Sequence, residues 1–112
     1  MRRAQVLPTA LALTLAQALL EQPRLPLSSR GSIPMLGLGT YQADGDALVT
    51  AVHHALQLDY RLIDTAESYS NYDSIALAME RAGVPRKDVF ITSKLSFSSY
   101  SYEGALRATA EA

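Results

Sequence analysis

The sequence predicts an α/β fold in which strands and helices alternate around a parallel sheet. Three short apolar segments, each with the features of a buried strand, begin near residues 36, 61 and 89. A stretch with helical periodicity follows each of them. The repeat of about 25 to 30 residues is the size of one strand and helix unit in a parallel sheet. Apolar strands that alternate with amphipathic helices are typical of the α/β class.

The first unit begins with the run MLGLGT, residues 35–40. Two glycines interrupt its apolar residues, which indicates a buried strand that ends where another group approaches the backbone closely. Residues 44–60 follow at helical spacing, and Asp44 or Asp46 is the expected N-cap. The apolar stripe of this helix consists of Leu48, Val52, Ala55 and Leu56.

The second unit consists of a strand in RLIDT, residues 61–65, and a helix over residues 71–83. We expect Asn71 at the N-cap of this helix and Gly83 at its end. Its apolar face consists of Ile75, Ala78, Met79 and Ala82.

The third unit has a β-branched, apolar strand in DVFITSK, residues 88–94, and a helix that begins near residue 101. Between them lies SFSSYSY, residues 96–102, which we interpret as an exposed loop. A sheet of only three parallel strands leaves both of its edges open.

The first 22 residues have the layout of a leader. Arg2 and Arg3 precede an apolar stretch over residues 6–20, and the small residues at 16 and 18 suit a signal peptidase. The stretch is shorter than a membrane-spanning helix requires, so a span is disfavoured. A cleaved signal or transit peptide and an uncleaved or non-folding leader remain alternatives, and the expected location is cytoplasmic or organellar. We interpret residues 23–34 as a linker followed by a small hairpin that turns at Gly31.

Composition excludes several classes of function. The formal net charge is -1, from 10 basic and 11 acidic residues that are scattered along the chain, so no nucleic-acid or anionic-lipid surface is predicted. The chain has no cysteine, which excludes a disulfide framework and a thiolate metal site. His53 and His54 are adjacent in the first helix and point about 100° apart, so no metal site is predicted.

Four ordered motifs resemble the N-terminal part of the aldo-keto reductase family. These motifs are IPMLGLGTYQ, YRLIDTAESYSN, GVPRKDVFITSKL and YEGALRA, and they extend from about residue 33 to the end of the chain. Members of this family are NADPH-dependent oxidoreductases built on a (β/α)8 barrel. The resemblance therefore implies a partial TIM barrel over residues 23–112: the hairpin and the first three strand and helix units.

The resemblance also implies the catalytic roles of three residues. Tyr69 would donate a proton to the carbonyl oxygen of a small aldehyde or ketone substrate, while NADPH delivers a hydride to its carbon. Because the reference pKa of tyrosine is about 10, such a donor needs a nearby cation, which Lys94 would supply. Asp64 would pair with that lysine. Spacing supports this set independently, since Asp64 and Lys94 each follow an apolar strand and Tyr69 lies in the loop after the second strand.

The resemblance assigns Gly39, Thr40, Tyr41 and Asp64 to the nicotinamide end of NADPH. The family's adenosine-phosphate clamp and active-site histidine correspond to positions beyond residue 112. Three residues depart from the family pattern. Tyr72 replaces a common glutamate, Ala76 a glycine, and Ser96 a tryptophan that generally lines the substrate pocket.

Three hypotheses about function follow. The chain is expected to be an N-terminal piece of an aldo-keto reductase that is inactive alone, because most of the cofactor site lies elsewhere. One alternative is a non-catalytic interaction module that self-associates through the open sheet edge. The other is an incomplete gene product with no role of its own.

Overall fold

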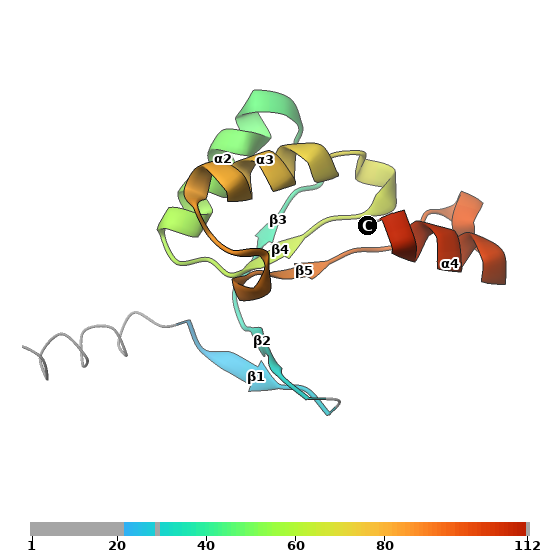
Figure 1. The fold of residues 1–112 in the computed structure, drawn as a ribbon, viewed down its shortest axis with the longest axis horizontal. Helices are drawn as coiled ribbons and strands as arrows, with labels where there is room; N and C mark the ends of the chain where they lie inside the picture. Colours follow the sequence, from blue (N-terminus) through green and yellow to red (C-terminus); the bar gives the residue numbers. More distant parts are fainter. Residues whose placement is uncertain (1–21, 29, 112) are drawn as a thin grey trace, which may run out of the picture.

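The computed structural model describes residues 22–28 and 30–111 (Figure 1). The expected leader over residues 1–22 lies outside these residues except for Gln22, so the leader and its boundary remain predictions. Within the described ranges, no helix is both long enough and apolar enough to cross a membrane.

The expected hairpin is confirmed. Strand β1 (Arg24–Pro26) pairs with β2 (Ser32–Pro34) in antiparallel register, with Leu25 opposite Ile33. Gly31 has a φ of 82°, a conformation that glycine adopts without steric cost. The Arg24 side chain donates hydrogen bonds to the hydroxyl and the carbonyl oxygen of Ser32, which hold the two strands together.

The main sheet is parallel, as predicted, and has the order β3-β4-β5. Its strands are β3 (Leu38–Gly39), β4 (Leu62–Asp64) and β5 (Phe90–Thr92). Ile63 in the central strand pairs with Leu38 on one side and with Ile91 on the other. The described residues therefore form two consecutive β-α-β units whose strands end at the same edge of the sheet.

The first strand of this sheet is shorter and less buried than expected. Only two residues pair, and Met35 and Leu36 are more than half exposed. A close approach does occur, but at Gly37, before β3 and not at its end, where a Cβ atom would lie 2.6 Å from Cγ of Leu62. At Gly39 no atom lies within 4 Å of the corresponding position.

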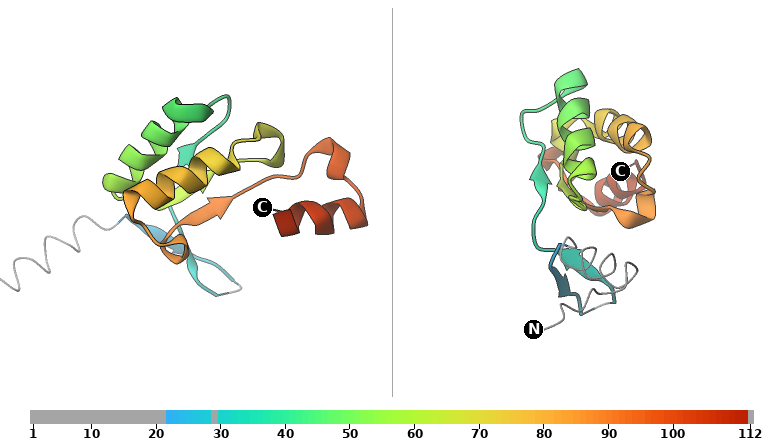
Figure 2. Two further views of the ribbon diagram at one scale, coloured as in Figure 1. Left: turned by 45° about the horizontal axis from the view of Figure 1, so that its top comes forward. Right: turned by 90° about the vertical axis from the view of Figure 1, so that its left-hand side faces the viewer.

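Helices α2 (Gly45–Gln57) and α3 (Tyr72–Ala82) pack side by side on one face of the sheet (Figures 1 and 2). The predicted apolar faces supply the core, and Ala82 is partly buried against it. Gly83 ends α3 in the left-handed region, with a φ of 65°. The core cluster consists of Leu48, Val49, Val52, Leu56, Ile63, Ile75, Ala78, Met79 and Val89.

Helix α4 (Tyr102–Glu111) lies past the carboxyl end of β5 and not over the face that α2 and α3 cover (Figure 2). Gly104 is its only buried residue within the described range. The short 3-10 turn η3 (Phe97–Ser99) connects β5 to this helix. Phe97 and Tyr100 are exposed, which confirms the expected exposed loop, although Ser99 in the same segment is buried.

The two N-cap residues occupy their predicted positions but do not make the expected capping hydrogen bonds. Asp44 and Asn71 do occupy the N-cap positions of α2 and α3, but neither side chain bonds to the helix backbone. Asp46 lies within the first turn of α2. The side chain of Asn71 is instead used in contacts with other segments.

Candidate active site

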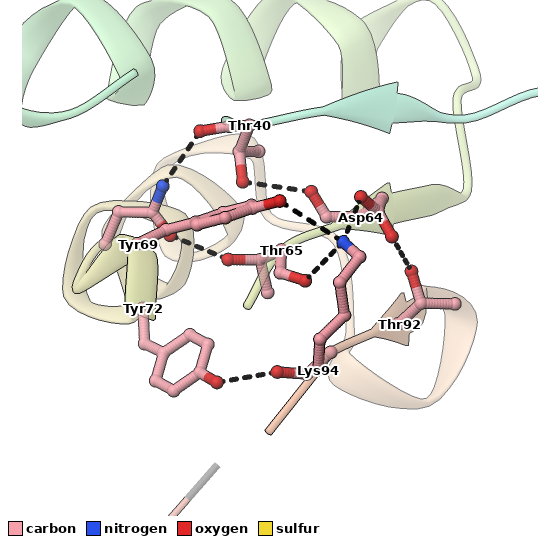
Figure 3. A network of polar contacts seen from close by, with 9 residues as sticks. Thr40, Asp64, Thr65, Tyr69, Tyr72, Thr92 and Lys94 are labelled. Atoms are coloured by element: carbon pink, nitrogen blue, oxygen red, sulfur yellow. Dashed lines mark hydrogen bonds and ion pairs between the residues drawn. The ribbon is translucent and has the colours of Figure 1, made fainter. Parts of the chain in front are cut away.

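The carboxyl edge of the sheet brings together the three residues predicted to be catalytic. Asp64 is the last residue of β4, Lys94 follows the end of β5, and Tyr69 ends the 3-10 turn η1 (Glu67–Tyr69). Nζ of Lys94 donates hydrogen bonds to Oδ2 of Asp64 at 2.6 Å, to the Thr65 carbonyl oxygen at 3.0 Å and to the Tyr69 hydroxyl oxygen at 3.4 Å (Figure 3). One ammonium group therefore connects the carboxylate and the phenol.

The carboxylate of Asp64 has two hydrogen-bond donors. In addition to Lys94, the hydroxyl of Thr92 donates to Oδ1 at 2.6 Å. The bond from Lys94, and then the bond from Thr92, lower the pKa of Asp64 below its ordinary value of 3.8. The bond to Asp64 is also the main cause that raises the pKa of Lys94. Both groups are therefore charged at neutral pH.

The ion pair is about half exposed, with 51% of the Lys94 side chain and 44% of the Asp64 side chain accessible. Exposed pairs of this kind contribute only about 0 to 1 kcal/mol to stability. The pair is therefore better suited to holding Lys94 in place than to stabilising the fold.

The lowered pKa of Asp64 predicts a loss of stability in acid. The folded state favours the ionised carboxylate, so the contribution of Asp64 is present above pH 3.8 and is lost as the pH falls through the lowered value. Glu67, whose pKa is also lowered, acts in the same direction below its ordinary value of 4.5. We expect the urea midpoint to fall between about pH 6 and about pH 3, and to fall less in Asp64→Asn. An equal fall in both proteins would contradict the role of Asp64.

The ring of Tyr69 lies between two other side chains. Its centroid is 5.1 Å from that of Tyr41, at a tilt of 54°, and 5.1 Å from Nζ of Lys94. Tilted aromatic pairs and cations near a ring are both favourable contacts. These contacts restrict the ring, and the hydroxyl group is directed toward Lys94 (Figure 3).

Three buried polar residues form a hydrogen-bonded cluster next to the site. Thr40, Thr65 and Asn71 are each at most 2% exposed. Asn71 accepts a hydrogen bond from the Thr65 hydroxyl at 2.7 Å, and its amide nitrogen donates to the carbonyl oxygens of Thr40 and Ala43 at 3.1 and 3.0 Å. Asn71 thus connects the segments after β3 and β4 at the start of α3.

The residues assigned to the cofactor lie around the same edge. The Thr40 hydroxyl donates to the Asp64 carbonyl oxygen at 3.0 Å, so it is already used inside the protein. Gly39 and Tyr41 are exposed, and space is open where a Cβ of Gly39 would lie. The edge therefore offers an uncovered backbone segment, an exposed aromatic ring and the Asp64 carboxylate within one region.

Sequence reasoning missed several residues that shape the site. Thr92 bonds Asp64, and the Tyr72 hydroxyl lies 2.6 Å from the Ser93 hydroxyl, next to Lys94. Glu67 accepts two hydrogen bonds from the segment after β5. For Thr92, Ser93 and Glu67 the available signal was position, since each lies within two residues of a strand end or of a predicted catalytic residue.

The two histidines do not take part in the site. His53 and His54 lie in α2 with ring centroids 5.7 Å apart. Over the described residues, no group of three or more potential metal ligands occurs.

Known proteins match the part of the chain that contains these site residues. The family model described as "Aldo/keto reductase family" matches residues 35–111. Morphine 6-dehydrogenase of Pseudomonas putida is 39% identical over 88 residues, which are 79% of this chain and 30% of that protein.

Solved structures agree with this match. The crystal structure of an aldo/keto reductase from Brucella melitensis aligns with a TM-score of 0.76 and 38% identity, over 82% of this chain and 35% of that one. The Bombyx mori aldo-keto reductase in complex with NADP aligns with a TM-score of 0.69 and 29% identity, over 81% of this chain and 33% of that one. The chain therefore spans about a third of the length of these relatives, and its fold corresponds to part of their barrel.

Proposed function

This chain belongs to the aldo/keto reductase family, and on that premise we propose that it provides the proton-donating part of an NADPH-dependent carbonyl reductase site. The observation that carries the proposal is the contact of Lys94 with both Asp64 and Tyr69. Its relatives include an oxidoreductase, morphine 6-dehydrogenase. The substrate would be the carbonyl group of a small aldehyde or ketone.

The proposed chemistry assigns one task to each residue. The Tyr69 hydroxyl hydrogen-bonds to the carbonyl oxygen of the substrate and transfers its proton as negative charge develops there. The Lys94 ammonium, 3.4 Å from the Tyr69 oxygen, stabilises the phenolate that remains. Asp64 and the Thr65 carbonyl oxygen hold the ammonium in this position.

The residues at this edge suit a nicotinamide group. The open space at Gly39 would let a planar ring approach the backbone. Asp64 pairs with Gly39 across the sheet, and the exposed Tyr41 follows two residues after Gly39. The reduced nicotinamide, when bound, supplies the hydride for the carbonyl carbon. Thr40 would act indirectly, through its bond to Asp64. The Bombyx mori relative with NADP supports this choice of cofactor.

The described residues correspond to about a third of the related structures. We propose that hydride transfer needs groups contributed by the remainder of a barrel, because the reacting atoms must be held in one geometry. The 112-residue chain alone is therefore expected to show no NADPH-dependent turnover.

A chimera tests this proposal. Residues 35–111 would replace the matching segment of the Brucella melitensis enzyme, and NADPH oxidation would be followed with a panel of aldehydes and ketones. We expect turnover in the chimera and none in the isolated chain. A chimera that folds and binds NADPH but reduces no carbonyl would contradict the proposed role of this segment. Turnover by the isolated chain would contradict the need for a complete barrel.

A further inference from the structure

We propose that Glu67 is a positioning residue that sets the contact between Tyr69 and Lys94. The significance of that contact rests on the proposed function, but the contact itself is a matter of geometry. Glu67 lies two residues before Tyr69 in η1, and it bonds to the segment that follows Lys94. It thus joins the two segments that carry the phenol and the ammonium.

Glu67 makes three hydrogen bonds to the segment after β5. Its backbone N–H donates to the Lys94 carbonyl oxygen at 3.0 Å. Its Oε2 accepts from the Ser96 N–H at 2.8 Å, and its Oε1 accepts from the Ser99 hydroxyl at 2.6 Å. Both carboxylate oxygens are therefore bonded to residues that lie 29 and 32 positions away in the sequence.

The charge of Glu67 suits this role. The bond from the Ser96 N–H, followed by the bond from the Ser99 hydroxyl, lowers the pKa of Glu67, and Arg107 on α4 adds a smaller attraction. An ionised carboxylate accepts stronger hydrogen bonds than a neutral group. The connection between the two segments is therefore present at neutral pH.

The Tyr69 contact depends on this connection more than the Asp64 contact does. Asp64 ends β4 and pairs with Thr92 at the end of β5, and Lys94 lies only two residues farther along, so the sheet itself brings the ion pair together. Tyr69 lies in η1, outside the sheet, and its hydroxyl is at 3.4 Å from Nζ of Lys94. Without the Glu67 carboxylate, we expect η1 to move away from the segment after β5, and Tyr69 to move with it.

The test compares the contact between Lys94 and Tyr69, and the reactivity of Lys94, among variants of the full chain. Lys87 and Lys94 are the only two lysines in the sequence, so Lys87, in the 3-10 turn η2 (Arg86–Asp88), is an internal reference. Two quantities are measured: the NOE between the Lys94 ε-methylene and the Tyr69 ring, and the trace acetylation of Lys94 relative to Lys87 by mass spectrometry. Hydrogen bonds to the ammonium lower its reactivity, because the neutral amine is the species that reacts.

In Glu67→Ala, we expect the NOE to be lost and the acetylation ratio to rise to the value found in Tyr69→Phe. The double variant should show no further rise, because both changes remove the same contact. Glu67→Gln, which keeps one acceptor oxygen, should give an intermediate ratio. Glu80→Ala, at an exposed position on α3, should match the unmodified protein.

An unchanged NOE and ratio in Glu67→Ala would overturn the proposal, as would additive effects in the double variant. If Glu67→Ala loses its dispersed NMR spectrum, Ser99→Ala takes its place, because it removes one donor and leaves Glu67 intact. An unchanged NOE and acetylation ratio in Ser99→Ala would then overturn the proposal. Neither readout requires turnover. Failure of the chimera to reduce carbonyls would therefore leave this result unaffected.

Discussion

Replacing Tyr69 with phenylalanine is expected to lower the turnover of the chimera by about 10²- to 10⁴-fold, the range typical of losing a general acid. Phenylalanine retains the ring, and with it the contacts to Tyr41 and to Nζ of Lys94. Only the hydroxyl and its bond at 3.4 Å are lost. The loss should therefore appear in kcat with little change in the affinity for NADPH. Steady-state kinetics and NADPH titration of the same samples provide both values.

The matched control is Tyr102→Phe. Tyr102 is 81% exposed at the start of α4, and this change also removes a single hydroxyl from a tyrosine. Its turnover should equal that of the unmodified chimera. A loss of less than about tenfold in Tyr69→Phe would mean that another group donates the proton.

Replacing Asn71 with alanine is expected to destabilise the folded chain by about 3 to 4 kcal/mol. The change removes three hydrogen bonds that are buried or partly buried. It leaves the Thr65 hydroxyl without its acceptor and the Ala43 carbonyl oxygen without its side-chain donor, while the Thr40 carbonyl oxygen keeps the Ala43 N–H. Buried polar groups that lose their partners cost more than the bonds themselves contribute. Urea unfolding, analysed by linear extrapolation, measures the change in free energy.

Gln57→Ala is the matched control, because it removes an amide side chain from an exposed position with a single bond at 3.4 Å. Its effect should stay below about 0.5 kcal/mol. A loss below about 1 kcal/mol in Asn71→Ala would show that water replaces the side chain without appreciable cost.

The features that the sequence predicts correctly depend on neighbours in the chain or on regular pairing. The buried stripe of α2 follows from helical spacing, and Gly83 ends α3 through its own conformational freedom. Asp64 and Lys94 meet because parallel strands end at the same edge. Each of these predictions needs only a local pattern and one rule of sheet geometry.

The features that the sequence does not predict depend on irregular segments. Asn71 at a helix start has the pattern of a cap, yet its side chain bonds the Thr40 carbonyl oxygen, 31 positions away. The position of Glu67 beside Tyr69 does not reveal its hydrogen-bond partners, because Ser96 and Ser99 approach it only once η1 and η3 have formed. The close approach of Leu62 to Gly37 likewise joins two separate segments and exists only in the packed sheet.

The separation of the site residues along the chain has a consequence for folding kinetics. The bonds from Lys94 to Asp64 and to Tyr69 join residues 30 and 25 positions apart, and the Thr40 bond to Asp64 spans 24. Contacts between distant residues form late, because the entropy of closing the intervening loops must first be overcome. The helices of this chain can therefore form before the contacts of the candidate site do, and a probe at Lys94 would report a phase of folding later than helix formation.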